Sequence, residues 1–317
     1  MNGLGAGEVE ISAVIPCLNE AENVMAIAKA VTDQLSAVAA SHEIIFIDNG
    51  STDRTVELVK QLCASDARIR LIINNQNYGQ MRSPTHAIYQ TRGRAVVGIC
   101  ADFQDPPEMI PQFVERWRAG VGIILAVRQS EKTSLLLRML RAVGYGFFER
   151  FGDYRVIPGA TGFGLYDREV VDCLKQWRDP EPFFRGMLVE SGFPLETIPY
   201  HRPPRAGGVT KNNVASLFSF AVSGLASSSK RLLRAPITLS LLVGVAAVLT
   251  LLIGAIEAVF GAFSWTFVWL ILAEVAFALV FLFLGLIGEQ VRIISAMVRN
   301  TPLVVEKERV NFPSSEQ

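Results

Sequence analysis

The sequence predicts an α/β protein built around a mainly parallel sheet, followed by a membrane part. From residue 11 to about residue 200, short apolar runs alternate with amphipathic stretches of ten or more residues, which is typical of βαβ units. The runs are almost unbroken, as expected for strands that helices cover on both faces. Half of the 317 residues are hydrophobic, and the excess is concentrated after residue 235.

Composition excludes several function classes. The length suggests about two domains. The 30 basic residues balance the 30 acidic ones, so the chain lacks the charge excess of a nucleic-acid-binding protein. Its four cysteines are scattered without CxxC spacing, which favours neither a zinc site nor a disulfide framework. The N-terminal stretch has no basic region followed by an apolar core, so we expect no signal peptide.

The first half of the chain predicts four strands that alternate with four helices. The first strand should end at Pro16, and Ser51 or Thr52 can cap the second helix. Pro107 should begin the fourth helix, because proline suits the first helical position. The strands are expected at residues 11–15, 43–47, 68–73 and 95–101, and the helices at about 19–40, 53–64, 81–92 and 107–119.

The second half continues the alternation up to residue 200. A glycine-rich turn at residues 159–164 should lead into a short strand, and a basic, glycine-rich loop at 201–211 should close the domain. The expected strands are 122–127, one ending near 167, and 195–200, and the expected helices are about 132–151, 168–177 and 182–190.

The C-terminal third predicts a membrane anchor. Residues 213–234 are amphipathic, which suits a helix in the membrane interface, with a core helix of the soluble domain as the alternative. Residues 236–256 carry no charge and are long enough to span a bilayer. Residues 265–288 form a second predicted span, and Trp265 and Trp269 lie where an interfacial belt is expected.

Charges around the two predicted spans indicate their orientation. Basic residues precede the first span and follow the second, whereas the loop between them has none. The positive-inside rule then places the N-terminal domain and both termini in the cytoplasm. If the protein is bacterial, the membrane is the inner (plasma) membrane. Glu274 lies inside the second span and is a functional candidate by default, with pairing to an arginine or another subunit as the alternative. The predicted parts are a domain at 1–211, an amphipathic segment at 212–234, a two-helix anchor at 235–289 and a cytoplasmic tail at 290–317.

Polar residues follow four of the predicted strands. Ligands of open parallel sheets bind beyond the carboxyl ends of the strands, and oxygen ligands there suit a hard divalent cation that holds a phosphate. A solvated turn is the alternative for any single cluster. Together the clusters can line one nucleotide-sized groove, and they lie at residues 16–20, 48–53, 74–79 and 102–105.

Five stretches in this order resemble the inverting glycosyltransferases of family 2, which have the Rossmann-like GT-A fold. The chain is similar to the branch that loads a sugar onto a polyisoprenyl phosphate, which includes dolichol-phosphate mannose synthases and bacterial prenyl-phosphate glucosyltransferases. The resemblance covers about residues 10–235 and, through the paired spans, most of the rest. The matching stretches are 14–20 (VIPCLNE), 47–53 (IDNGSTD), 77–79 (NYG), 101–108 (ADFQDPPE) and 205–211 (RAGGVTK).

The resemblance implies a role for individual residues. One group would bind the donor nucleotide, with Asp48 taking a hydrogen bond from the edge of the base, and it consists of Pro16, Asn19, Glu20, Asp48, Asn49, Asn77 and Asp102. A second group would act on the phosphates. In it, Asp102 and Gln104 hold Mg²⁺ or Mn²⁺ and take part in catalysis with Arg128 and Arg138, and Arg205 and Lys211 belong to a loop that closes over the donor. Solvated helix faces are the alternative for the arginines.

Two positions depart from the family pattern. Asn49 stands where the turn usually has a second aspartate, which removes a charge but keeps a hydrogen-bonding group. Cys100 stands where the metal motif often has its first acid. Because thiolate is a poor ligand for Mg²⁺, the cation would depend on Asp102, Gln104 and the phosphates, with Asp105 as a further candidate. A relative without catalytic activity is one alternative that this departure leaves open.

Two other enzyme classes lack their motifs here. A processive polysaccharide synthase should carry QxxRW after the metal motif, whereas residues 112–117 read QFVERW, with one residue too many and too early in the chain. A Rossmann oxidoreductase needs GxGxxG after the first strand. Residues 16–20 have no glycine, and the glycines at 159–164 come too late.

The resemblance therefore implies an enzyme that transfers one sugar, with inversion, from a UDP- or GDP-linked donor to a polyprenyl phosphate of the undecaprenyl or dolichyl type. The alternative is a membrane-anchored subunit that binds or assembles nucleotide sugars without turnover. The sequence leaves the sugar, the base and the formation of a homo-oligomer open.

Overall fold

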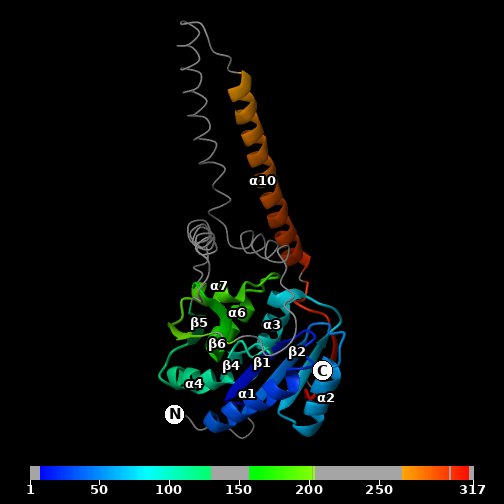
Figure 1. Cartoon of the computed structure of the whole chain (residues 1–317), viewed down its shortest axis with the longest axis vertical. Helices are drawn as coiled ribbons and strands as arrows, with labels where there is room; N and C mark the ends of the chain where they lie inside the picture. Colours follow the sequence, from blue (N-terminus) through cyan, green and yellow to red (C-terminus); the bar gives the residue numbers. More distant parts are fainter. Residues whose placement is uncertain (1–7, 130–156, 202, 204–265, 300, 314–317) are drawn as a thin grey trace. The chain divides into compact units, whose positions relative to one another are not determined.

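The computed structural model describes residues 8–129, 157–201, 203, 266–299 and 301–313 (Figure 1). These residues belong to two units. One contains the sheet domain together with the C-terminal residues from Arg299 onward, and the other contains helix α10 (Thr266–Arg299) up to Val298.

The sheet domain has one eight-stranded mixed sheet in the order β7-β5-β6-β4-β1-β2-β3-β8. The four strands β4, β1, β2 and β3 pair in parallel, and so do β5 and β7, which confirms the predicted βαβ half. Strands β6 and β8 run antiparallel to their neighbours. The strands are β1 (Ile11–Cys17), β2 (His42–Asp48), β3 (Ile69–Asn74), β4 (Ala95–Gly98), β5 (Ile123–Arg128), β6 (Ala160–Asp167), β7 (Leu195–Tyr200) and β8 (Glu306–Val310).

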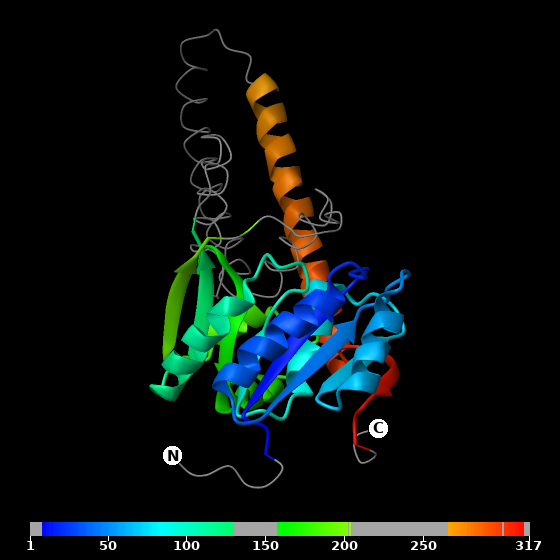
Figure 2. The ribbon, with the colours of Figure 1, turned by 60° about the horizontal axis from the view of Figure 1, so that its bottom comes forward.

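Helices cover both faces of this sheet. Helices α1, α2 and α4 lie over one face, as Figure 2 shows, while α3, α6 and α7 pack on the other. The helices are α1 (Val24–Val38), α2 (Thr55–Ser65), α3 (Gly79–Tyr89), the short 3₁₀ turn η1 (Pro107–Met109), α4 (Ile110–Arg118), α6 (Arg168–Gln176) and α7 (Phe184–Glu190).

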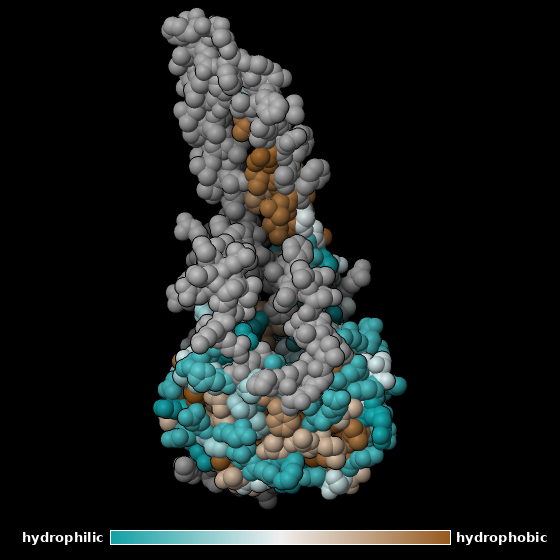
Figure 3. Space-filling view, viewed as in Figure 1, coloured by the Kyte–Doolittle hydropathy of each residue, from teal (hydrophilic) through white to brown (hydrophobic). Residues whose placement is uncertain are grey.

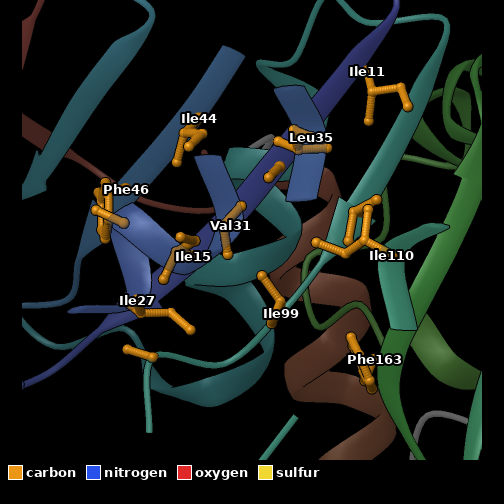
Figure 4. Close-up of a cluster of buried hydrophobic side chains, with 14 of the residues drawn as sticks. Ile11, Ile15, Ile27, Val31, Leu35, Ile44, Phe46, Ile99, Ile110 and Phe163 are labelled. Atoms are coloured by element: carbon orange, nitrogen blue, oxygen red, sulfur yellow. The ribbon is translucent and has the colours of Figure 1, made fainter. Parts of the chain in front are cut away.

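Each face of the sheet has its own hydrophobic core. On the α1 face, Ile27, Val31 and Leu35 recur at helical spacing and pack over Ile15 and Phe46 (Figure 4). All five side chains are fully buried, and each burial of this kind stabilises a fold by about 1.5–3 kcal/mol. Alternate strand residues enter the second core, under α3 and α6. Burial on both faces explains why the strands are unbroken apolar runs.

Two local predictions are wrong. Neither Ser51 nor Thr52 caps α2, because the Ser51 hydroxyl accepts the Asn19 amide and the Thr52 amide donates to the Asn19 side chain. The carboxylate of Asp53 instead accepts the Thr55 amide at 3.0 Å. The fourth strand also ends at Gly98 rather than at residue 101, because the chain turns there towards the polar cluster. Pro107 does begin the next helical turn, as predicted.

The C-terminal residues include a strand that the sequence analysis did not expect. After α10 the chain returns to the sheet, where β8 pairs antiparallel with the edge strand β3. The Asn75 amide donates to the Val305 carbonyl at 3.0 Å, and Phe312 is buried in the core under α3. Because β8 follows the predicted anchor in the sequence, truncation before the anchor would remove it and expose the edge of β3.

Helix α10 covers the second predicted span. Many of its apolar side chains are exposed, among them Trp269, Leu272, Val280 and Ile287. In Figure 3 the described part of this helix has a largely brown, hydrophobic surface. No helix among the described residues meets both the length and the apolarity needed to cross a bilayer. The helix predicted at 132–151, the amphipathic segment 213–234, the first span at 236–256 and the side chain of Glu274 lie outside the described residues.

Partly buried side chains hold β8 to α3, and they make a testable contribution to stability. Glu306 accepts hydrogen bonds from His86, at 2.5 Å, and from Arg309. Burial raises the pKa of Glu306, but the hydrogen bonds from His86 and Arg309 outweigh this and lower it from 4.5 to about 2. A carboxyl group whose pKa is depressed by folding stabilises the folded state above its unfolded pKa, and loses that effect as pH falls through the folded value.

We therefore expect Glu306→Gln to lower the free energy of unfolding near pH 7, and the difference from the unsubstituted protein to shrink between pH 4.5 and about 2. Urea titrations of both proteins across this range measure it. A difference that stays constant with pH would contradict the assignment.

Candidate functional site

The strand directions bring the four predicted clusters to one edge of the sheet. Strands β1 to β4 are mutually parallel, and β5 points the same way because β6 is antiparallel to both β4 and β5. Asp48, Asn74 and Arg128 are each the last residue of a strand at this edge. The prediction of a common edge is confirmed.

Hydrogen bonds join the loops that follow β1 and β2. Asn19 adopts a left-handed backbone conformation (φ 55°), its amide donates to the Ser51 hydroxyl at 2.8 Å, and its side chain accepts the Thr52 amide at 2.7 Å. The Glu20 amide donates to the Thr55 hydroxyl at 2.8 Å. Asp53, which the sequence analysis did not assign to the site, also accepts the Ala21 amide. These bonds give the two loops one fixed arrangement.

Asn49 joins the second cluster to the third. Its Nδ2 donates to Asn77 Oδ1 at 2.8 Å and to the Gly79 carbonyl at 3.1 Å. Its Oδ1 accepts the Tyr78 amide at 2.9 Å and Asn74 Nδ2 at 3.2 Å. An aspartate here could accept two bonds but could not donate two, which is a physical reason for the departure at this position. Asn49 and Asn77 thus hold the loop, and their contact with a nucleotide stays a prediction.

Asp48, at the end of β2, is almost fully buried, with 1% of its surface exposed. Its Oδ2 accepts the amides of Gly50 and Ser51, each at 3.1 Å. Its Oδ1 is also buried, and it has no hydrogen-bond partner among the residues that the structure describes. A buried acceptor without a donor costs stability, so this oxygen marks a place for a donor from a ligand.

The field at this edge is negative. Burial raises the pKa of the Cys17 thiol well above its usual range, and the nearby carboxylates of Asp48, Glu20 and Asp53 raise it further. Cys17 is therefore a neutral, buried thiol. A diphosphate bound near these carboxylates needs cations beside it, from side chains or a metal ion.

The fourth cluster follows β4 as a tight turn. Asp102 Oδ1 accepts the Gln104 amide at 3.1 Å, and Phe103 between them has a left-handed backbone (φ 58°). Asp105 is almost fully buried, and its two oxygens accept the Cys100 amide at 3.1 Å and the Tyr200 hydroxyl at 3.2 Å. Asp105 therefore serves to hold the turn, which weighs against it as a metal ligand. No sequence signal pointed to Tyr200, which lies 95 residues further along the chain.

The donor set in this turn fits a divalent cation held mainly by phosphate. Within the described residues no three His, Cys, Asp or Glu side chains gather around a point, which leaves Asp102 and Gln104 as the predicted ligands. Mg²⁺ usually binds through one or two carboxylates together with substrate phosphates and waters. The side chain of Cys100 is exposed.

Arg128 is half-buried at the end of β5, and its amide donates to the Gly159 carbonyl at 3.1 Å. A Cβ at Gly159 would lie 2.8 Å from the Arg128 carbonyl oxygen, so glycine is needed for this approach. Pro16 lies within β1, opposite Ile47. Arg138, Arg205 and Lys211 lie outside the described residues.

An open pocket of about 600 Å³ lies beside the turn, between the start of α4 and the end of β7. Its lining includes Glu108, Glu115 and Tyr200.

Comparisons with known proteins identify the family of this chain. The profile of "Glycosyl transferase family 2" matches residues 12–175. An uncharacterised glycosyltransferase of Synechocystis sp. is 31% identical over 222 residues, 70% of each chain, and the bactoprenol glucosyl transferase of Shigella phage SfX is 30% identical over 227 residues, 71% of this chain and 74% of the relative. Glucosyl-3-phosphoglycerate synthase of Mycobacterium tuberculosis, solved with Mn²⁺, UDP-glucose and phosphoglyceric acid, aligns with 70% of this chain and 78% of its own, at 18% identity and a TM-score of 0.46. The family model matches half of the chain, and the Synechocystis and phage relatives are 31% and 30% identical to it. This chain therefore belongs to glycosyl transferase family 2.

Proposed function

We propose that this glycosyltransferase moves a single sugar from a nucleotide diphosphate to a polyprenyl phosphate, with inversion at the anomeric carbon. The observation that carries the proposal is that two carboxylates follow parallel strands of the sheet at the same edge. Asp48 ends β2 and has a buried oxygen without a donor among the described residues, and Asp102 lies on the turn that follows β4. The bactoprenol glucosyl transferase among the relatives supports the choice of acceptor.

Asp48 would recognise the base of the donor. A ring N–H of uracil or guanine can donate to its Oδ1, and that bond would satisfy the buried acceptor. The loops joined through Asn19 and Asn49 would surround the rest of the nucleotide. Both UDP- and GDP-linked donors carry such an N–H group, so the choice between them belongs to the experiment.

The reaction needs little acid–base chemistry from the protein. An oxygen of the acceptor phosphate, already an anion, attacks the anomeric carbon while the bond from that carbon to the donor diphosphate breaks. A divalent cation, Mg²⁺ or Mn²⁺, held by Asp102 and Gln104 would neutralise charge on the leaving diphosphate. Arg128, and with it Arg138, Arg205 and Lys211, would supply guanidinium and ammonium contacts to phosphate. Catalysis would come chiefly from positioning and charge stabilisation.

The proposed acceptor and the charge pattern of the sequence support a reaction at the cytoplasmic face of a membrane, which in a bacterium would be the inner membrane. The exposed apolar side chains of α10 support a lipid-facing role for that helix. The amphipathic segment 213–234 would hold the domain at the headgroup level, where a lipid phosphate lies.

The test uses the purified full chain in lipid nanodiscs with radiolabelled UDP- and GDP-sugars, undecaprenyl phosphate, and either Mg²⁺ or EDTA. We expect a labelled lipid product that requires metal, and an anomeric configuration opposite to that of the donor by NMR. Donor binding without transfer would favour the alternative, a subunit that binds nucleotide sugars without turnover. Cys100, which stands in place of the first acid of the metal motif, is the reason to test for this outcome. Failure to bind any nucleotide would overturn the proposal.

A further inference from the structure

The C-terminal segment, residues 301–313, contacts the chain on both sides of the Asn74–Gly79 loop. At the β3 end, Glu306 pairs with Asn74 in the sheet, and the Asn75 amide donates to the Val305 carbonyl at 3.0 Å. At the α3 end, Arg82 donates from Nε to the Leu303 carbonyl at 2.8 Å and from Nη2 to the Pro302 carbonyl at 2.9 Å. The loop between Asn74 and Gly79 is thus held by backbone far away in the sequence.

Two residues of α3 and the residue that follows its last turn, at four-residue spacing, contact the C-terminal segment. Arg82 binds the two carbonyls, His86 binds Glu306 at 2.5 Å, and Gln90 accepts from Arg309 at 3.0 Å. Residues at this spacing share one face of a helix. This face of α3 is therefore occupied by the C-terminal segment along its length.

The same loop is attached to the candidate donor site. Asn74 Nδ2 donates to Ser83 of α3 at 2.9 Å and to Asn49 Oδ1, and Asn49 also accepts the Tyr78 amide. Asn49 directly follows Asp48, whose Oδ1 has no hydrogen-bond donor among the described residues. The Arg82 guanidinium also lies 5.4 Å from the Tyr78 ring centre. Leu303 is thus connected to Asp48 in a few steps. Arg82 binds the Leu303 carbonyl, its neighbour Ser83 binds Asn74, and Asn74 binds Asn49, the residue after Asp48.

We infer that Arg82 is a positioning residue for donor binding: by tying the start of α3 to the C-terminal segment, it holds the Asn74–Gly79 loop in the arrangement that presents Asp48 to the nucleotide. This inference rests on the proposed function. It assigns to the segment after the last predicted span a role in the donor site as well as in closing the sheet edge.

Lys60→Ala provides a matched control for Arg82→Ala. Lys60, on α2, binds Glu308 of β8 at 2.7 Å, so both changes remove a basic side chain that contacts the C-terminal segment. Only Arg82 connects to the loop. We expect Arg82→Ala to weaken UDP or GDP binding about tenfold in calorimetry, and to raise KM for the donor by a similar factor with little change in kcat. Lys60→Ala should leave both within about twofold, and Arg82→Lys, which keeps one ammonium donor, should recover part of the affinity.

Hydrogen exchange separates this inference from the proposed function. The amides of Tyr78 and Gly79 are bound by Asn49 and Asn77, so Arg82→Ala should speed exchange in the peptide covering residues 74–82 even without nucleotide, and Lys60→Ala should not. Equal nucleotide affinity and equal exchange in Arg82→Ala and the unsubstituted protein would overturn the inference. So would equal losses in both variants, since these would indicate a general loss of stability. If the unsubstituted protein binds no nucleotide, the proposed function fails, and the exchange result still decides whether Arg82 positions the loop.

Discussion

Asp102→Asn should reduce metal-dependent transfer by about a thousandfold, which corresponds to ~4 kcal/mol of transition-state stabilisation. The change removes the negative charge that would hold the cation on the donor diphosphate. It keeps a side-chain oxygen that can accept the Gln104 amide, so the turn after β4 should fold as before. Steady-state rates measured against metal concentration, together with nucleotide binding by calorimetry, give the result. Nucleotide should still bind, because Asp48 is unchanged.

Two variants of Cys100 serve as controls for this site. Cys100→Ser should retain most of the activity, because the Asp105 side chain accepts the backbone amide of residue 100, which the substitution keeps. Cys100→Asp would add an oxygen ligand next to the turn and should lower the metal concentration for half-maximal rate. If Asp102→Asn keeps its metal dependence while Cys100→Ser loses it, the assignment of Asp102 is wrong.

Asp48→Asn should weaken nucleotide binding by about a hundredfold, or ~3 kcal/mol, because it can turn an amide donor towards the ring N–H that Oδ1 would otherwise accept. The remaining oxygen can still accept the Gly50 and Ser51 amides, so the turn should persist. Titration calorimetry with UDP and GDP measures the loss.

The same substitution at Asp53 is the matched control. Asp53 also accepts backbone amides, those of Thr55 and Ala21, and it lies outside the predicted donor set. Burial raises its pKa, but hydrogen bonds from the Thr55 hydroxyl and from backbone amides outweigh this and lower it. Asp53→Asn should weaken affinity much less than Asp48→Asn does, because Asp53 is not predicted to contact the nucleotide. Similar losses at both positions would mean that Asp48 acts only through the stability of the turn.

The sequence by itself determined the parallel half of the fold and the edge at which the site lies. The reason is local: apolar runs such as 43–47 are buried on both faces whatever their partners, and polar residues at the carboxyl ends of parallel strands meet at one edge. The sequence alone predicts Asp48 and Asp102 at this edge, because each directly follows an apolar run, 43–47 and 95–101 respectively.

Only the tertiary structure decided which polar side chains hold the loops and which are left for a ligand. Asn49, Asp105 and Asp48 are similar in sequence terms, yet the first two have their oxygens bonded within the fold and the third keeps a buried oxygen without a described partner. Those bonds join residues that are far apart in the chain, such as Asp105 and Tyr200, and no local pattern encodes them. The same holds for β8, whose charged sequence, Glu306 to Val310, resembles a solvated tail. It becomes a strand because its backbone pairs with the edge of β3, and because Glu306 and Arg309 bind His86 and Gln90.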